Sequence, residues 1–519
     1  MDAKVKDSEL VKERNPQVSS TTFTEAPVNA SGHHQELDRN FNLLSICALA
    51  ITSGNTWVAL GGSVTVAIYD GGPPGVLYEF IAVSMFYWLI AASIAELASA
   101  MPSAGGVYHW ASITAGRHGR ICGFFAGHIN FLAWIFGLAA TAQIAAAQVV
   151  SMYAAFHPAF VTQRWHVFVA YLIFTWIPCF LVLFANKLLP MFESIGGFLI
   201  ISGVFITIVV CASMPDVHAT NDFVWRDWQN STGYTSNGFV FLLGMLNGAF
   251  AVGTPDVVSH LAEEIPRPTK NIPKAILAQF VVGFISSFAY LISLFYSISD
   301  LNSVLDSRYL FPLATIYDQA TNSASGTVGL LVLAFLPNFI ALIGVFITSS
   351  RMFWTLARDN ATPFASTFAK VSKTYKNPFN SVLFCAVIST ILGCIYLGSS
   401  TAFNAFVGSF VVLSSLSYLA AILPHLLNRR SGIKPGWFWM PGAIGFVVNT
   451  VACLYIITFI VIFCFPFSLP VSASTMNYAS LMIGGLSLFV VGFWFLRKGA
   501  YEGPKYIPLD AEILAADAI

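Results

Sequence analysis

The residues with the clearest potential for chemistry are Asp256 and His260, which lie four positions apart at the end of an apolar run. At helical spacing they share one face, where a carboxylate and an imidazole could exchange a proton. The alternative is that His260 is a hydrogen-bonded packing residue. Gly253, Thr254 and Pro255 precede Asp256 and predict a break in the helix. Thr254 suits an N-cap and Pro255 the first position of a restarted helix, which would place Asp256 in its first turn.

The composition predicts that these residues lie in a membrane. Of the 519 residues, 56% are hydrophobic and 10% are charged, and the mean hydropathy is +0.71. Runs of about 20 apolar residues recur, each long enough to cross a bilayer. The net charge is zero, which gives no indication of nucleic acid as a partner. The eight cysteines form no CxxC pair, so neither a disulfide framework nor a metal site is predicted.

We predict an all-α integral membrane protein with about twelve spans. Residues 1–40 are expected to be a disordered cytosolic tail, 41–500 the transmembrane domain, and 498–519 a cytosolic tail. Within the domain, 41–213 and 237–426 form two five-helix sets, and 437–497 holds two further helices. The predicted spans are 42–69, 75–98, 121–155, 166–185, 189–212, 237–262, 276–298, 327–350, 380–398, 402–425, 440–464 and 477–496.

The first and sixth spans, each the first of its five-helix set, are interrupted. Ser53-Gly54-Asn55-Thr56-Trp57 divides the first span, and Gly253 to Asp256 divides the sixth. Backbone groups freed by such breaks are tolerated only where they face protein or a wet cavity. Matching breaks in two repeats indicate a binding site between them. The predicted substrate-binding residues are Ser53, Gly54, Asn55, Thr56, Trp57, Phe250, Ala251, Gly253, Thr254 and Asp256.

These residues could recognise either charge on a small molecule. Helix N–H groups at the Asn55-Thr56 restart attract a carboxylate. The faces of Trp57, Phe250 and Trp134 could bind a cation, and each such contact would contribute roughly 0.5–2 kcal/mol of binding free energy. The alternative is that these aromatic residues only pack against their neighbours.

Asp256 has two explanations. An acid in the first turn of a helix stabilises that end by about 0.3–1 kcal/mol without binding any ligand. Burying a carboxylate in a membrane costs about 2.5 kcal/mol or more, which the cap does not offset. We therefore favour a functional Asp256, which contacts a substrate cation or carries a proton.

Other acids lie within the spans or at their ends. Glu193, in the fifth span, is a proton site or the partner of a salt bridge, and with Asp256 and His260 it completes the set of proton-coupling candidates. Glu96, Glu263 and Glu264 lie where basic residues are abundant. They are expected to form a cytosolic gate of ion pairs, or to belong to ordinary solvated loops.

The distribution of Lys and Arg predicts the orientation. With the N-terminus in the cytosol, 22 of the 25 basic residues lie inside, because only Arg164, Arg226 and Arg308 fall outside. Both termini are then cytosolic. Of three N-x-S/T sequons only Asn230 lies outside, which makes it the glycosylation candidate.

Three motifs at the ends of spans carry a family resemblance. They are ELASAMPSAGG (Glu96–Gly106), HLAEEIPRPTKNIPKAI (His260–Ile276) and SRMFWTLARDNATP (Ser350–Pro363). Together they resemble the amino acid–polyamine–organocation transporter superfamily. They are most similar to its fungal amino acid/choline transporter branch, which includes choline and 4-aminobutyrate permeases. The similarity covers about residues 40–500.

The resemblance implies a LeuT-type fold, a 5+5 inverted repeat with discontinuous helices 1 and 6 and substrate between them. It also implies alternating access driven by a proton gradient, with Phe250 as an aromatic gate. Many proton-coupled relatives hold a lysine in the fifth span. Here Glu193 falls near that position and Lys187 lies two turns earlier.

We therefore expect a proton-coupled secondary transporter for a small amine, amino acid or quaternary ammonium compound, in the plasma membrane. Its partners are this small-molecule substrate and the lipid bilayer, and it needs no cofactor beyond the proton gradient. The sequence does not predict an oligomeric state. The alternatives are a nutrient sensor that does not transport, and an exporter of a cationic secondary metabolite. An enzyme is not expected, because no cluster of His, Asp or Cys lies near one membrane face.

Overall fold

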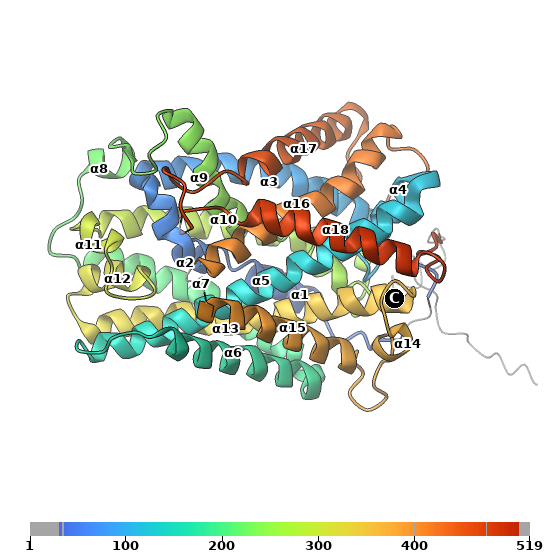
Figure 1. Ribbon diagram of the computed structural model, residues 1–519, viewed down its shortest axis with the longest axis horizontal. Coiled ribbons are helices and arrows are strands. Elements are labelled where there is room, and N and C mark those ends of the chain that lie inside the picture. Colours follow the sequence, from blue (N-terminus) through green and yellow to red (C-terminus); the bar gives the residue numbers. More distant parts are fainter. Residues whose placement is uncertain (1–30, 34–35, 399–400, 474, 508–519) are drawn as a thin grey trace, which may run out of the picture.

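The computed structural model describes residues 31–33, 36–398, 401–473 and 475–507 (Figure 1). This part of the chain is helical apart from two antiparallel two-residue strands, β1 (Asp70–Gly71) and β2 (Gln229–Asn230). It contains twelve helical segments long and apolar enough to cross a membrane, which confirms the predicted architecture. They are formed by α1 (Leu43–Gly54) with α2 (Thr56–Tyr69), α3 (Gly72–Ala100), α5 (Gly119–Phe156), α6 (Arg164–Phe184), α7 (Leu189–Ser213), α9 (Asn237–Val252) with η3 (Val257–Leu261), α10 (Pro268–Tyr296), α13 (Ala324–Arg358), α15 (Phe379–Gly398), α16 (Ala402–Leu427), α17 (Gly442–Ile462) and α18 (Ala479–Arg497).

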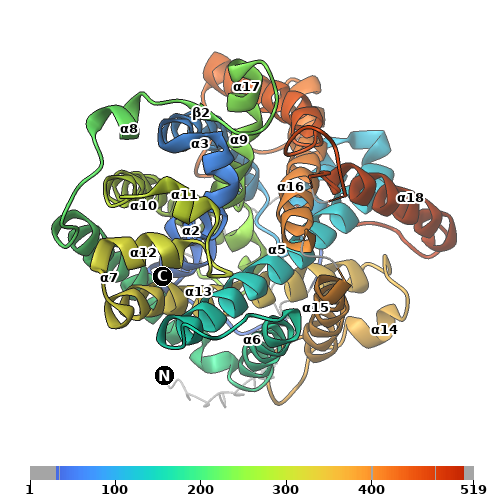
Figure 2. The ribbon, with the colours of Figure 1, turned by 60° about the vertical axis from the view of Figure 1, so that its left-hand side comes forward.

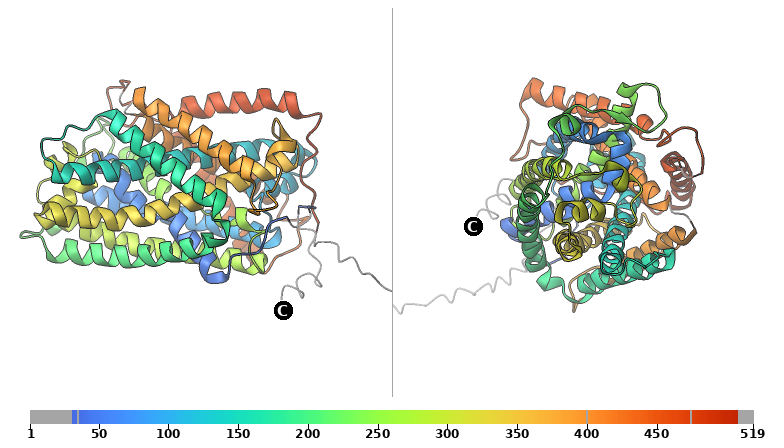
Figure 3. Two further views of the ribbon diagram at one scale, coloured as in Figure 1. Left: turned by 90° about the horizontal axis from the view of Figure 1, so that it is seen from below. Right: turned by 90° about the vertical axis from the view of Figure 1, so that its left-hand side faces the viewer.

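The long helices run roughly along one axis (Figures 1 and 3). At one end, which we call the α4 end, lie the short helices α4 (Val107–Thr114) and α14 (Ala365–Phe368). The opposite end, the α8 end, holds α8 (Asn221–Trp225), α11 (Leu301–Leu305) and α12 (Leu313–Thr321). Two 3-10 turns, η1 (Gly116–His118) and η2 (Asn186–Leu188), precede α5 and α7.

Burial separates the central helices from the lipid-facing ones. Helix α5 passes through the middle of the bundle, whereas α17 and α18 lie at its rim (Figure 2). Only Ala479 and Val490 of α18 are buried, and exposed apolar side chains such as Phe198 and Leu488 cover the outside. In water such a surface would be a liability, but in a bilayer it contacts acyl chains of similar polarity.

The predicted breaks in the first and sixth spans are both present. Helix α1 ends at Gly54 and α2 begins at Thr56, because Asn55 takes a left-handed conformation with φ 37° and ψ 41°. Helix α9 ends at Val252, and the chain resumes as η3 at Val257. The division into inverted repeats stays a prediction.

One detail of the sixth span was predicted wrongly. Asp256 was placed in the first turn of an α-helix capped by Thr254, but it precedes a 3-10 helix at the N-cap position. Its side chain makes no capping hydrogen bond. The physical reason is that the Asp256 carboxylate accepts hydrogen bonds from other helices instead, as described below.

The predicted terminal tails are partly packed against the α4 end. Residues 1–30, 34–35 and 508–519 lie outside the described part. Leu37 is only 2% exposed and packs with Ala104 and Trp354, and disorder of the N-terminal tail stays a prediction. The C-terminal segment is similarly held, because Tyr501 is buried and the Lys505 backbone N–H donates to the carbonyl of Ser31.

Asn230 lies on β2 at the α8 end. Its Nδ2 atom donates to the Tyr234 carbonyl at 2.7 Å and to Oδ1 of Asn237 at 3.2 Å. Attaching a glycan to this nitrogen would remove at least part of this pairing, and glycosylation stays a prediction.

Candidate functional site

A cavity of about 40 Å³ lies between the two helix breaks. Five of the predicted substrate-binding residues line it: Ser53, Gly54, Asn55, Phe250 and Thr254. No charged side chain is among the described residues that line it. At about 10–15 Å³ per water, the cavity has room for a few waters but not for an amine-sized substrate, so substrate binding requires it to widen. The other lining residues are Ala59, Trp134, Gly137, Thr141, Ile144, Asn338, Ala341, Val345 and Phe410.

Three aromatic rings meet at this cavity. The ring centroid of Phe410 is 5.8 Å from that of Trp134 and 5.9 Å from that of Phe250, both in edge-to-face geometry. Aromatic faces carry negative charge density and attract cations. Phe250 and Trp134 were predicted, but Phe410 on α16 was missed. Nothing in its local sequence distinguishes it from the other 45 phenylalanines.

Side chains from neighbouring helices support the broken backbone. Gln279 on α10 donates through Nε2 to the carbonyl of Thr254 at 3.2 Å and to its Oγ1 at 2.7 Å. Asn55 donates through Nδ2 to Oδ1 of Asn338 at 3.3 Å. Ser53 Oγ and Asn55 Oδ1 have no hydrogen-bond partner among the described residues. Both residues line the cavity, and their two oxygens are buried hydrogen-bond acceptors at its wall.

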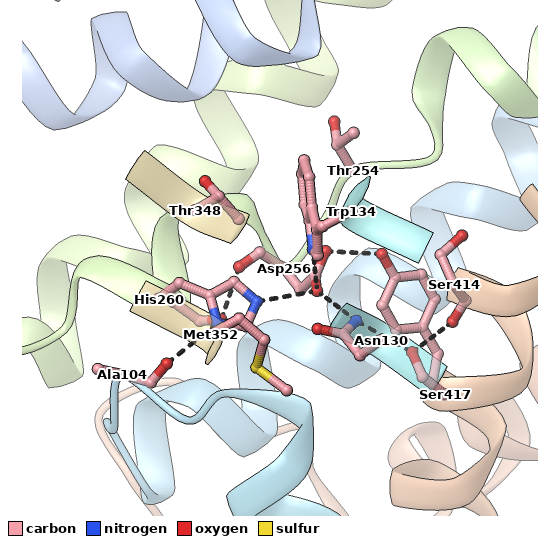
Figure 4. A network of polar contacts seen from close by, with 12 residues as sticks. Ala104, Asn130, Trp134, Thr254, Asp256, His260, Thr348, Met352, Ser414 and Ser417 are labelled. Atoms are coloured by element: carbon pink, nitrogen blue, oxygen red, sulfur yellow. Dashed lines mark hydrogen bonds and ion pairs between the residues drawn. The ribbon is translucent and has the colours of Figure 1, made fainter. Parts of the chain in front are cut away.

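Asp256 lies in a network of polar contacts (Figure 4) and is not among the residues that line the cavity. Its fully buried carboxylate accepts four hydrogen bonds, from Tyr418 Oη at 2.6 Å, Asn130 Nδ2 at 2.9 Å, and Trp134 Nε1 and His260 Nε2 at 3.2 Å each. Its contact with a substrate cation stays a prediction, because Asp256 is not among the residues that line this cavity. Instead, Asp256 fixes the orientation of Trp134, whose indole ring does line the cavity.

The predicted pair of Asp256 and His260 is present and is fully buried. His260 Nδ1 lies 3.0 Å from the carbonyl oxygen of Ala104, which can only accept, so Nδ1 carries hydrogen. Oδ2 of Asp256 already accepts from Asn130 and Trp134, which favours its ionised form. Nε2 of His260 lies 3.2 Å from this Oδ2, so the two side chains are placed to share a hydrogen.

The remaining predicted binding residues do not line the cavity. Thr56 and Trp57 face α10. The Trp57 ring packs edge-to-face on Tyr290 at 5.2 Å, and a Cβ on Gly283 would lie 2.7 Å from Thr56 Oγ1. Helix α2 starts immediately after Asn55, and this helical phase turns both side chains away from the cavity. Ala251 and Gly253 are also buried outside its lining.

Glu193 lies beside the break of the first span. It is 0% exposed, and neither carboxyl oxygen has a hydrogen-bond partner within the described part of the chain. If Gly344 of α13 carried a Cβ atom, this atom would lie 2.1 Å from Ser53 Oγ and 3.3 Å from Glu193 Oε1. The Ser53 and Glu193 oxygens therefore both lie beside this glycine. The alternative prediction, a salt bridge, is wrong, and Lys187 is exposed.

The three predicted gate acids are all buried at the α4 end, and each pairs with an arginine from another segment. Two of these arginines belong to the third motif of the sequence, on α13. The ion pairs are Glu96 with Arg430 at 2.8 Å, Glu263 with Arg358 at 2.9 Å and Glu264 with Arg351 at 2.8 Å; His425 also lies 3.2 Å from Glu96. Two of these ion pairs join the second and third motifs of the sequence, and the first motif is joined to Arg430 instead.

Comparison with known proteins identifies the family. The family described as amino acid permease matches residues 41–488. The chain is 32% identical to the choline transporter of Saccharomyces cerevisiae, with 90% of this chain and 82% of the relative covered. It is 27% identical to the swainsonine transporter of Arthroderma benhamiae (89% and 91% covered) and 24% identical to an amino-acid permease of Arabidopsis thaliana (91% and 94% covered). The chain therefore belongs to the amino acid permease family, within the amino acid–polyamine–organocation superfamily of membrane transport proteins.

Proposed function

We propose that the protein is a proton-coupled carrier of a small organic cation of the choline type. The observation that carries this proposal is the cavity between the two helix breaks. It presents three aromatic rings and two free oxygens but no charged side chain. The similarity to a choline transporter supports the same substrate class.

The chemistry of the cavity suits a quaternary ammonium better than other amines. A trimethylammonium group has no N–H donor, and aromatic faces bind it without a carboxylate. The free oxygens of Ser53 and Asn55 can accept the hydroxyl hydrogen of choline. A zwitterionic amino acid or 4-aminobutyrate has only the partial charge of a helix terminus for its carboxylate, so these molecules are the natural competitors to test.

We place the α4 end in the cytosol of a cell whose plasma membrane holds the protein. In the described part of the chain, Arg164, Arg226 and Arg308 are the only Lys or Arg residues in the loops of the α8 end, in line with the positive-inside rule. The three buried ion pairs then form the cytosolic gate, and substrate passes to the cytosol when they separate.

For the proton we favour Glu193 over Asp256 and His260. Asp256 has four donors, so protonating it would disrupt the contacts that orient Trp134. Glu193 has no donor, and a change in its protonation alters chiefly its own charge beside Ser53. A proton there neutralises a buried carboxylate next to the substrate site, which links proton and substrate movement.

Two other functions remain as competitors. Export of a cationic secondary metabolite is favoured by the similarity to a relative named for swainsonine. A sensor that binds without transport would share the same site, and only a flux measurement separates it from a carrier.

Phe410→Leu should raise the KM for choline uptake about five- to thirtyfold, because it removes a cation–π contact of about 1–2 kcal/mol. Phe410→Tyr keeps an aromatic face and should stay near wild type. Uptake of labelled choline, 4-aminobutyrate, amino acids and a polyamine is measured in cells that lack their own permeases.

Phe198→Leu is the matched control, because this phenylalanine is 70% exposed on the lipid-facing side of α7. A second control is the neutral isostere in which a tert-butyl group replaces trimethylammonium. If the isostere competes as well as choline, or if Phe410→Leu has no effect, recognition of the cation by the aromatic rings is wrong.

Glu193→Gln should abolish accumulation driven by an imposed pH gradient in proteoliposomes and preserve exchange of choline across the membrane without a gradient. The amide resembles the protonated carboxyl in shape but binds and releases no proton. Asp256→Asn should instead weaken binding in both assays, because Trp134 loses its acceptor. If Glu193→Gln accumulates as much choline as wild type under the imposed pH gradient, Glu193 is not the proton carrier.

Arg351→Met should destabilise the protein by about 3–5 kcal/mol, because it leaves Glu264 buried without its partner. The double variant Arg351→Met/Glu264→Leu should recover most of this loss. Arg226→Met, which breaks an exposed pair with Asp222, should leave stability nearly unchanged. Thermal unfolding in detergent reports the effect. Equal losses in the single and double variants would show that an unpaired Glu264 is not the cause of the loss.

A further inference from the structure

Two acids, Asp70 and Glu79, lie together at the α8 end, where α3 begins, and neither has a role in the transport step proposed above. Glu79 is 1% exposed and Asp70 is 6% exposed. Oε1 of Glu79 and the carbonyl oxygen of Asp70 are each 3.4 Å from the point that a Cβ of Gly75 would occupy, so the two residues are neighbours. Burial raises the pKa of the Asp70 carboxyl well above its usual value.

Glu79 is buried in the contact between α3 and α9. A Cβ on Gly244 of α9 would lie 2.2 Å from Oε2 of Glu79, so the carboxyl fills the space that glycine leaves. We call this contact the α3–α9 seam. Neither carboxyl oxygen of Glu79 has a hydrogen-bond partner among the residues that the structure describes. The seam is thus closed over a carboxyl group without a donor.

Within the described ranges of the chain, no basic group near the seam compensates Glu79. Helix α9 carries no ionisable residue. The titratable groups on the other surrounding segments bond elsewhere, are exposed, or lie further along α3. They are Tyr234, which donates to Pro466; the exposed Asp227; the exposed Arg226–Asp222 pair; Tyr290, which bonds to Tyr317; Tyr296, which donates to Asn221; and Tyr455, which packs on Tyr87 two turns along α3.

Burying an ionised carboxyl without hydrogen-bond donors between two packed helices costs much free energy, whereas burying a protonated carboxyl there costs far less. We propose that Glu79, with Asp70 beside it, is a proton-binding site that controls closure of the α8 end. The proton passes from a hydronium ion of the medium to one carboxylate oxygen. The seam closes over the neutral acid, and ionised Glu79 keeps the seam open and hydrated.

The proton has a short path to this site. A cavity of about 30 Å³ next to Asp70 is lined by Asn247, Asn404 and Asn477 together with apolar residues, and it can hold a water. Glu79 does not line this cavity, so Asp70 is the group nearer to the water. The inference rests on the proposed function only in placing the α8 end outside the cell.

The test uses a native thiol and no substrate, so its failure is independent of the substrate proposal. Cys464 is half-buried between Phe463 and Phe465, which line the cavity beside Asp70. Its labelling rate by a membrane-impermeant maleimide is measured in whole cells across pH, for wild type and Glu79→Gln. The ratio of the two rates at one pH cancels the pH dependence of the thiol itself, and Cys464→Ser confirms which thiol reacts.

The labelling rate of Cys464 in wild type, divided by the rate in Glu79→Gln, should be near one at about pH 5.5. At about pH 8 it should be about tenfold or more, because only wild type has a carboxyl at position 79 that ionises and opens the seam. Asp70→Asn removes a neighbouring negative charge, weakens attraction of the proton, and should move the opening to lower pH. This second variant tests the site even where Glu79→Gln does not reach the surface. Asp227→Asn, at an exposed acid of the same end, should match wild type.

Three results would overturn the proposal. The first is a ratio that stays constant across pH. The second is an opening that depends on pH in Glu79→Gln as it does in wild type. The third is closure at alkaline pH caused by added sodium or potassium at constant ionic strength, which would assign the acids to a metal cation instead of a proton.

Discussion

A carboxylate buried in a membrane protein must receive its hydrogen bonds from the protein, and Asp256 is where this constraint organises the structure. Its donors come from α5, α16 and η3. The broken part of the sixth span is therefore held against two helices that are distant in sequence. The same contacts use the indole N–H of Trp134 and leave its ring to line the cavity. If this cavity binds the substrate, as proposed, Asp256 acts on recognition through Trp134.

The buried acids fall into two groups with different consequences. Asp256, Glu96, Glu263 and Glu264 have donors or arginine partners, and removing a partner would leave an uncompensated charge. Glu193 and Glu79 have no partner in the described part of the chain. A group whose charge is stabilised by partners stays ionised, whereas a group without partners takes up and releases a proton as its surroundings change. Proton-linked movement is therefore expected at the second group.

The sequence was sufficient for the spans, both helix breaks and the polar side of the site. Hydropathy sets the spans, and Gly54, Asn55 and Gly253 mark the breaks. It could not distinguish Trp57 from Trp134, because the phase of a restarted helix decides which ring reaches the cavity. Phe410 and the partnership of Glu96 with Arg430 depend on helices that are far apart in sequence. Neither has a local signal, since the contacts exist only after the bundle has packed.

The two ends of the bundle are closed by different physics, and under the proposed function this difference would give a transport cycle its direction. Arginine stays charged at every physiological pH, so the arginine partners of Glu96, Glu263 and Glu264 keep their charge at the α4 end. The α8 end closes over Glu79, which needs a proton to be buried. If the α8 end faces outward, as proposed, acid outside favours closure of that end. Under the proposed function, a cation bound behind the closed outer end can leave only through the α4 end. A proton gradient would then drive inward movement although no charged side chain is among the described residues that line the central cavity.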